Sequence, residues 1–201
     1  MLRPWHILLA GGLAFATGYA EPPAAAHKKA EEVPPETMPL VLYEDCTPDM
    51  KLPYSPSGWM GDTDQIECDT CSDEQPHGGK TCIKFTFNKG TWGGVVWQFP
   101  AEDWGDIPDG LNLTGAKKLT FWARGEKGGE PVKFEMGIIG RDKKYPDSGS
   151  AHLNAKLSEK WEQYSISVGS KNLKCIKTGF AWSVLRRAKP TTFYVDDVRY
   201  E

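Results

Sequence analysis

Carboxylates occur in two segments whose other residues are typical of β-strands. The segment 40–45 (LVLYED) ends in two acids, and the segment 192–201 (TFYVDDVRYE) carries Asp196 and Asp197 in its middle. Carboxylates gathered in this way can bind a cation, supply the acid and base of a glycosidase, or accept hydrogen bonds from the amides of a turn. The choice among these depends on the strands that hold them.

The closing segment changes phase at its acid pair. Phe193 and Val195 alternate in one phase, whereas Val198 and Tyr200 alternate in the other. Because side chains along a strand have a period of two, this change requires a bulge or bend at the Asp pair. A strand that ends a chain must pair with an earlier one, and we expect that partner to be 40–45.

The cysteines offer a second kind of chemistry. In an exported chain, structural disulfides are the default interpretation of clustered cysteines. A zinc site would need Cys46 or His77 as a distant fourth ligand, and a redox-active Cys-x-x-Cys would need a strand before it and a helix after it, neither of which is visible. Disulfide pairing cannot be deduced, and one cysteine must stay free or bridge to another chain. The disulfide candidates are Cys46, Cys68, Cys71 and Cys82, and Cys175 is the candidate free thiol.

A tryptophan among polar neighbours is the first candidate for ligand binding. Trp122 shares its strand face with Thr120 and Arg124, opposite the apolar residues of the same strand. Such a residue is either an exposed platform for a sugar ring or is packed under a loop. If it is a platform, Arg124 and Glu135, on the polar face of the next strand, could hydrogen-bond the sugar hydroxyls.

Three further aromatic residues lie in turn-rich segments, where binding residues are often found. They are Trp92, Trp104 and Tyr145. Each could equally cover the edge of the core. Trp97 and Trp182 are in phase with apolar neighbours, so we expect both to be buried.

A catalytic function has little support in the sequence. Carboxylates are frequent, but no spacing singles out a glycosidase pair, and there is no G-x-S-x-G or H-E-x-x-H motif. The candidate pairs would come from Asp103, Asp106, Asp109, Glu135, Asp142 and Asp147. We therefore expect a binding protein rather than an enzyme, with a glycoside-active enzyme as the less favoured alternative.

The N-terminal segments are predicted to lie outside the fold. Residues 1–20 have a basic start, a short apolar stretch and a small-residue exit, which predicts a secretory signal peptide cleaved near Ala20. Residues 21–37 are rich in Pro, Ala and charge and predict a disordered linker. The apolar stretch is too short and Gly-rich for a transmembrane segment. We expect an exported protein, periplasmic or extracellular.

The rest of the chain, residues 38–201, predicts a single all-β domain. The 21 Gly and 15 Pro residues punctuate short apolar runs with strand periodicity, and no long helical period is present. Eight to ten antiparallel strands in two sheets, a jelly-roll β-sandwich, is the consistent fold. The region 47–80 is predicted to be mostly turns, with a short strand near Trp59. The net charge of −3 excludes a basic footprint for nucleic acid.

Four segments together resemble a known family. They are 97–105 (WQFPAEDWG), 111–125 (LNLTGAKKLTFWARG), 160–164 (KWEQY) and 193–200 (FYVDDVRY). They are similar to galactose-binding-like jelly rolls of the carbohydrate-binding-module type, near the family-11 modules of bacterial glycan-degrading systems. The resemblance covers about residues 40–201. Assembly factors that bind proteins rather than sugars resemble this chain at the same level.

The resemblance implies a structural Ca²⁺ and a glycan ligand. Such modules commonly hold Ca²⁺ between an N-terminal acid and an Asp of the last strand, which correspond here to Glu44 or Asp45 and to Asp196. The alternative is that the acids are solvated or bond turn amides. We expect non-catalytic recognition of a glycan on a polar and aromatic sheet face or loop rim, or, alternatively, an envelope protein partner bound by the same surface.

Overall fold

The computed structural model describes residues 33–47, 51–185 and 190–201. The predicted signal peptide, residues 1–20, and most of the predicted linker, residues 21–37, lie outside these ranges. In the described part of the chain, no helix is long and apolar enough to cross a membrane.

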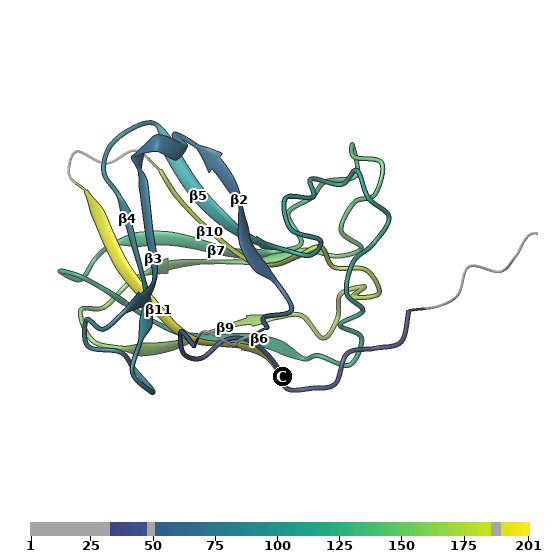
Figure 1. Cartoon of the computed structure of the whole chain (residues 1–201), viewed down its shortest axis with the longest axis horizontal. Coiled ribbons are helices and arrows are strands. Elements are labelled where there is room, and N and C mark those ends of the chain that lie inside the picture. Colours follow the sequence, from purple (N-terminus) through teal and green to yellow (C-terminus); the bar gives the residue numbers. More distant parts are fainter. Residues whose placement is uncertain (1–32, 48–50, 186–189) are drawn as a thin grey trace, which may run out of the picture. The chain divides into compact units, whose positions relative to one another are not determined.

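Two antiparallel sheets face each other, as predicted for a β-sandwich (Figure 1). Sheet A has the order β3-β4-β11-β6-β9, with β1 also paired to β11, and sheet B has the order β2-β5-β10-β7-β8. The strands are β1 (Leu40–Tyr43), β2 (Ser55–Gly61), β3 (Ile66–Ser72), β4 (Cys82–Phe87), β5 (Trp92–Gln98), β6 (Lys118–Gly125), β7 (Pro131–Met136), β8 (Ala151–Lys156), β9 (Glu162–Ser167), β10 (Thr178–Leu185) and β11 (Thr191–Tyr200). A single 3-10 turn, η1 (Thr63–Gln65), is the only helical element in the described residues.

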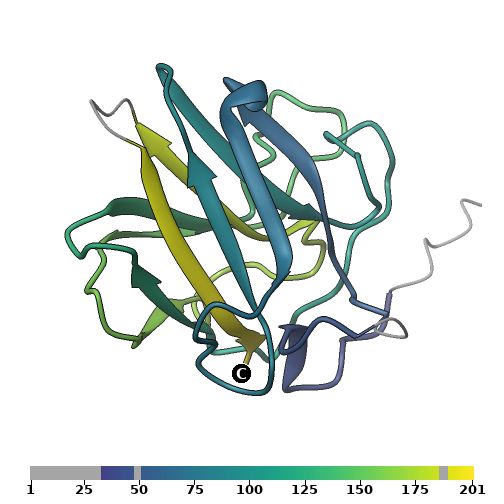
Figure 2. The same ribbon diagram turned by 60° about the vertical axis from the view of Figure 1, so that its left-hand side comes forward.

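The closing strand β11 runs through the middle of sheet A (Figure 2). Asp196 pairs with Trp122 and Arg199 pairs with Thr120, so two residues of β11 oppose the single residue between them on β6. Asp197 is one of the two and has a left-handed φ of 49°. The predicted bulge at the acid pair is therefore confirmed.

Strand β1 pairs with the end of β11, through Leu40 with Tyr200 and Val41 with Arg199. This confirms the predicted pairing of the first and last strands. The bulge places Val195 and Val198 both in the core although they are three residues apart. The phase change thus keeps apolar side chains inward along the whole of β11.

The strand count was predicted too low. Eleven strands lie in the described residues instead of eight to ten, and the segment expected to be mostly turns contains β3. In β3 (IECDTCS), polar and charged residues outnumber apolar ones, and its side chains are mostly exposed or half-buried. An edge strand whose outer face is exposed to solvent needs few apolar residues. Its sequence therefore lacks the clear alternation of apolar and polar residues that marks a strand.

The core fills the space between the sheets with aromatic side chains. Trp97 and Trp182 are both buried, as predicted. The ring centroid of Phe85 lies 4.9 Å from that of Trp182, and the ring of Phe193 lies 5.0 Å from that of Trp182. Because aromatic side chains bury large areas, this cluster dominates the hydrophobic stabilisation of the sandwich.

The folded unit begins before the predicted boundary at residue 38. The Asn112 side chain donates a hydrogen bond to the carbonyl of Val33 at 2.6 Å, and the amide of Glu36 donates to the carbonyl of Asn112 at 2.8 Å. The last residues of the predicted linker are therefore hydrogen-bonded to the sandwich.

One disulfide joins Cys46 and Cys71, whose Cα atoms are 5.1 Å apart. It links the chain after β1 to the edge strand β3. Cys68, Cys82 and Cys175 are free thiols. Burial raises the pKa values of Cys68 and Cys82 to about 12, so both stay protonated near neutral pH. Disulfide formation is thus confirmed for two of the four candidates.

Candidate functional site

The loop between β3 and β4, residues 73–81, lies over the outer face of sheet A. The His77 ring stacks on Trp122 with centroids 3.8 Å apart and planes 15° apart. The indole N–H of Trp161 donates to the carbonyl of Gln75 at 2.9 Å. Of the two arrangements considered for Trp122, the structure shows the one in which the indole is packed under a loop.

Arg124 also holds this loop. Its guanidinium lies 3.7 Å from the centroid of the Tyr194 ring and donates to the carbonyl of Glu74 at 2.8 Å. The Glu74 carboxylate in turn accepts hydrogen bonds from the Tyr194 hydroxyl at 2.6 Å and from the Lys84 ammonium. Arg124 is only 8% exposed, so most of its surface serves internal packing.

Asp196, on strand β11, binds the backbone of the β3–β4 loop. Its Oδ2 accepts hydrogen bonds from the amides of His77 at 2.9 Å and Gly78 at 3.1 Å, and its Oδ1 accepts one from the amide of Asp197 at 2.9 Å. The residue is 0% exposed. Burial raises the pKa of Asp196 to about 6, although the amide donors act in the opposite direction.

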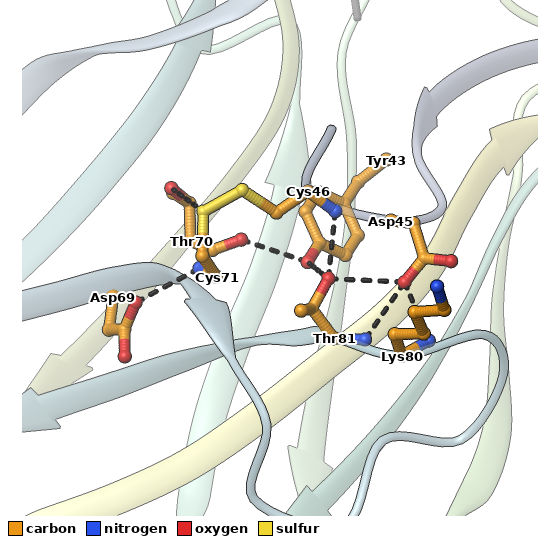
Figure 3. Close-up of a disulfide and its surroundings, with 8 residues drawn as sticks. All are labelled: Tyr43, Asp45, Cys46, Asp69, Thr70, Cys71, Lys80 and Thr81. Carbon is orange, nitrogen blue, oxygen red and sulfur yellow. Dashed lines mark hydrogen bonds between the residues drawn. A yellow bond between two sulfur atoms is a disulfide. The ribbon is translucent and has the colours of Figure 1, made fainter. Parts of the chain in front are cut away.

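Asp45 anchors the other end of the loop, beside the Cys46–Cys71 disulfide (Figure 3). Its Oδ1 accepts hydrogen bonds from the amides of Lys80 and Thr81, each at 2.8 Å, and from the Thr81 hydroxyl at 3.1 Å. The two amides hold the pKa of Asp45 below its usual value. Both predicted metal-binding aspartates therefore act as hydrogen-bond acceptors for loop amides.

The surroundings of the predicted calcium ligands favour the binding of loop amides over the binding of a calcium ion. Calcium requires six to eight oxygen ligands, whereas N–H groups point at Asp45 and Asp196, and Glu44 is exposed. Within the described residues, no group of three or more His, Cys, Asp or Glu side chains could hold a metal ion. The calcium site stays a prediction.

The outer face of sheet B differs from that of sheet A in its side chains, because its central strands carry several small residues. Gly94 pairs with Ser183, and Val96 pairs with Ala181, on neighbouring strands β5 and β10. A Cβ atom added to Gly94 would lie 2.4 Å from a backbone carbonyl oxygen and 2.9 Å from Cε of Met60. Val96 and Ala181 are both 0% exposed, so other residues cover the centre of this face.

Two hollows adjoin along β7 and β8 on this face. One, of about 400 Å³, is lined by Lys133, Asn154 and Ser183. The other, of about 570 Å³, is lined by Glu135 and His152 and by the loops beyond them. Lys133 pairs with Asn154, and Glu135 with His152, so the two hollows border successive outward pairs of the same strands. We call the two hollows, together with the Lys133–Glu135 pair between them, the sheet B groove.

Polar groups on the groove can both donate and accept hydrogen bonds. The Lys133 ammonium lies 2.6 Å from the Glu135 carboxylate, and the Ser183 hydroxyl donates to the same carboxylate at 3.4 Å. Asn154 and His152 are exposed beside them. Such a set suits a ligand rich in hydroxyl groups, which also donate and accept.

Trp104 lies over β2, at the edge of sheet B opposite to β8. A Cβ atom added to Gly58 of β2 would lie 3.0 Å from Cζ2 of Trp104. The loop that carries Trp104, residues 99–110, is attached to the sheet by Gln98, whose amide donates to the carbonyl of Asp103 at 2.8 Å. Trp104 is half-buried, so part of its indole is available to a ligand.

Tyr145 and Trp92 border the same face at different ends. The amide of Tyr145 donates to the carbonyl of Gly105 at 3.0 Å, which joins its loop to that of Trp104 beyond the ends of the strands (Figure 1). Trp92, at the start of β5, is 38% exposed and pairs with Leu185, which is 76% exposed. These two aromatic residues therefore lie on elements next to the groove and do not line its hollows.

Lys177 fixes the Trp104 loop from inside. Its side chain is 0% exposed, and its ammonium lies 2.8 Å from Oδ2 of Asp103 while also donating to the carbonyls of Ile107 and Asp109. Burial acts to raise the pKa of Asp103, but the ammonium and the backbone amides around it hold that pKa below its usual value. The loop of residues 99–110 is therefore held by the buried ammonium group of Lys177.

The six predicted ligand-binding residues fall on two different faces. Trp92, Trp104, Glu135 and Tyr145 border the outer face of sheet B, whereas Trp122 and Arg124 lie on sheet A. The prediction that Glu135 lies beside Trp122 is wrong, because β6 and β7 belong to different sheets. Neighbouring strands in a jelly roll often cross from one sheet to the other, and alternation alone does not reveal the crossing.

Sequence reasoning missed three residues that shape these faces. They are His77, Lys177 and Ser183. Lys177 lies between Ile176 and the start of the largely apolar strand β10 at Thr178. A charged residue in such a position signals a buried partner. His77 and Ser183 gave no comparable signal, because their roles depend on how the loop and the strands pack.

Comparison with known sequences gives no match. No protein-family model matches the chain, and no curated protein matches it. Similarity is found only at the level of structure.

Several solved structures share the fold. The family 11 carbohydrate-binding module from Clostridium thermocellum, solved with a β-1,3-1,4-mixed-linked tetrasaccharide, is similar with a TM-score of 0.53 and 13% identity, over 80% of this chain and 95% of that one. A family 30 carbohydrate-binding module gives a TM-score of 0.55 and 14% identity, over 82% and 99% of the two chains. A family 30 module of a Clostridium thermocellum cellulosomal cellulase gives 0.52 and 13%, over 82% and 98%. The protein therefore has the β-sandwich fold of these modules.

Proposed function

We propose that the protein is a non-catalytic carbohydrate-binding module that binds a glycan along the sheet B groove. The observation that carries the proposal is the groove itself, formed by two hollows of about 400 and 570 Å³ along strands β7 and β8. The groove is open along the strands, so it suits a chain of sugar units rather than a single enclosed ring.

The chemistry of the groove supports the same ligand. Sugars present hydroxyl groups at their edges and C–H groups on their faces, so they require paired donors and acceptors together with an aromatic surface. Lys133, Glu135 and Asn154 supply the first. Trp104, which lies over Gly58 on β2 of the same sheet, is the aromatic side chain that we propose for the second. Similarity of fold to carbohydrate-binding modules raises the expectation without establishing it.

The carboxylates near the groove support binding rather than catalysis. Asp103 is bonded to Lys177, and both oxygens of Asp147 accept hydrogen bonds from the protein, including the Thr178 hydroxyl at 2.6 Å. Glu135 is paired with Lys133. A glycosidase needs two carboxylates free to act on one bond, and these three are engaged elsewhere.

Affinity electrophoresis tests the proposal. Native gels that contain soluble polysaccharides should retard the protein relative to a non-binding reference, and Trp104→Ala should reduce the retardation while its circular dichroism stays unchanged. Absence of retardation across neutral, acidic and mixed-linkage glycans would overturn the proposal. We further propose that the protein is exported through the signal peptide predicted at residues 1–20, which cell fractionation would test.

A further inference from the structure

Positively charged side chains border the larger hollow of the sheet B groove. It is lined by the β7–β8 loop and by the turn at residues 170–172. Two cationic side chains, Arg141 and Lys171, border it, and both residues are exposed. Its volume of about 570 Å³ lies within the range typical of small-molecule sites, roughly 300–1,000 Å³.

These two cations lack carboxylate partners within the described part of the chain. Some other exposed cations do form such a pair, for example Lys118 with Glu201 at 2.9 Å. Arg141 and Lys171 form no such pair among the described residues. Their charge is therefore available to a ligand.

The acids that line the same hollow do not cancel this charge. Glu135 is neutralised by Lys133, 2.6 Å away. Asp147 is buried, and its oxygens accept hydrogen bonds from the amides of Ile139, Lys177 and Thr178. Both carboxylates are thus satisfied by the protein, whereas Arg141 and Lys171 are not.

Hydroxyl side chains complete the hollow. Ser148, Ser150 and Ser170 line it together with the two cations. The Ser148 hydroxyl already donates to the carbonyl of Asn172 at 2.9 Å. The two cations and the hydroxyls of Ser150 and Ser170 form a surface for an anionic group attached to a polyhydroxyl ligand. An arginine can bind a carboxylate or sulfate through two parallel hydrogen bonds, and a lysine adds a second positive charge.

We infer that the glycan bound in the sheet B groove is acidic, with a carboxylate or sulfate on the sugar that occupies the larger hollow. Arg141 and Lys171 bind this anionic group, and the remainder of the groove binds the neighbouring sugars. The inference rests on the proposed function, because it specifies the charge of the ligand at the same surface.

The experiment compares three polysaccharides in affinity gels: polygalacturonate, a sulfated galactan, and a neutral mixed-linkage β-glucan. The full chain should be retarded more strongly by at least one acidic polymer than by the neutral one, and added salt should weaken that retardation. The double variant R141A/K171A should lose about tenfold in affinity for the acidic polymer. Its retardation by the neutral polymer should change little.

A matched control separates a local site from general charge attraction. The double variant K80A/K89A also removes two exposed lysines, which lie outside the groove, and should leave retardation unchanged. Equal losses in the two double variants would overturn the inference, as would retardation by the neutral polymer alone. Failure of all three polymers to retard the protein would instead overturn the proposed function. Retardation by only one acidic polymer would identify the anionic group as carboxylate or sulfate.

Discussion

The imidazole of His77 lies flat on the indole of Trp122, with ring centroids 3.8 Å apart, and its Nδ1 lies 2.7 Å from the carboxylate of Asp197. These contacts attach the β3–β4 loop to the bulge of the closing strand. Trp122 consequently takes part in the packing of sheet A, and the face of its indole that stacks on His77 is not available to a sugar.

The first prediction concerns Trp122. Trp122→Ala should destabilise the fold by roughly 1–3 kcal/mol, less than a fully buried tryptophan because the side chain is half-buried. Glycan retention by the folded variant should stay unchanged. Denaturant unfolding and affinity electrophoresis measure the two effects. A folded variant that no longer binds glycan would show that sheet A takes part in recognition.

The second prediction follows from the buried carboxylate of Asp196. Its pKa is raised from 3.8 to about 6 in the folded protein, so the folded state holds this proton more tightly than the unfolded state. The stabilisation from this group is therefore fully present below about pH 4 and is lost as pH rises through about 6. The rise of this pKa from 3.8 to about 6 corresponds to roughly 3 kcal/mol in the free energy of unfolding.

Asp196→Asn should remove that component of the pH dependence. Relative to the wild type, the variant should gain stability as pH rises from 4 to 7, measured by denaturant unfolding at each pH. The comparison is made between the two proteins at each pH, so that only the contribution of residue 196 differs. Parallel curves for wild type and variant would contradict the raised pKa.

The third prediction concerns the internal cation of the Trp104 loop. Lys177→Met keeps the length of the side chain but leaves the buried Asp103 without its partner. Breaking a buried ion pair in this way costs about 3–5 kcal/mol. Glycan retention should also fall, because the loop that presents Trp104 loses its attachment.

Lys118→Met is the matched control for Lys177→Met. Lys118 forms an exposed ion pair with Glu201 at 2.9 Å, and such pairs contribute about 0–1 kcal/mol. Thermal unfolding compares the two variants. Equal stability of both would mean that the buried pair contributes no more than a surface one.

The fourth prediction concerns metal. Since N–H donors point at Asp45 and Asp196, we expect a chelator such as EGTA to leave the melting temperature unchanged. A drop of several degrees that added Ca²⁺ restores would establish the calcium site that the resemblance implies. In that case the hydrogen bonds at one of these aspartates would have to give way to metal coordination.

The architecture could be predicted from local patterns because the core strands follow simple alternation. Ile83, Phe85 and Phe87 alternate inward, and the break in phase at Asp196 required the bulge that the structure shows. Edge strand β3 could not be predicted in this way, because most of its residues face water. An alternation of apolar and polar residues appears where one face of a strand is buried. An edge strand with little buried surface therefore lacks this pattern.

The candidate site was harder to predict because a face is made by strands distant in sequence. Glu135 and Trp122 lie on consecutive strands yet on opposite sheets. Ser183 contributes to the groove only because β10 lies between β5 and β7 in sheet B. A serine in an apolar strand carries no information about what lies beside it until the strand order is known.

The most direct test of the binding face is a pair of serine substitutions. Ser183 lines the sheet B groove, and Ser165 is exposed on strand β9 of sheet A, paired with Thr120 on the outward side. Ser183→Trp fills the groove, whereas Ser165→Trp adds the same bulk to the other sheet. Affinity electrophoresis of the two folded variants should show that Ser183→Trp loses glycan retention and Ser165→Trp keeps it. Retention by Ser183→Trp, or its loss in Ser165→Trp, would contradict the assignment of the glycan to sheet B.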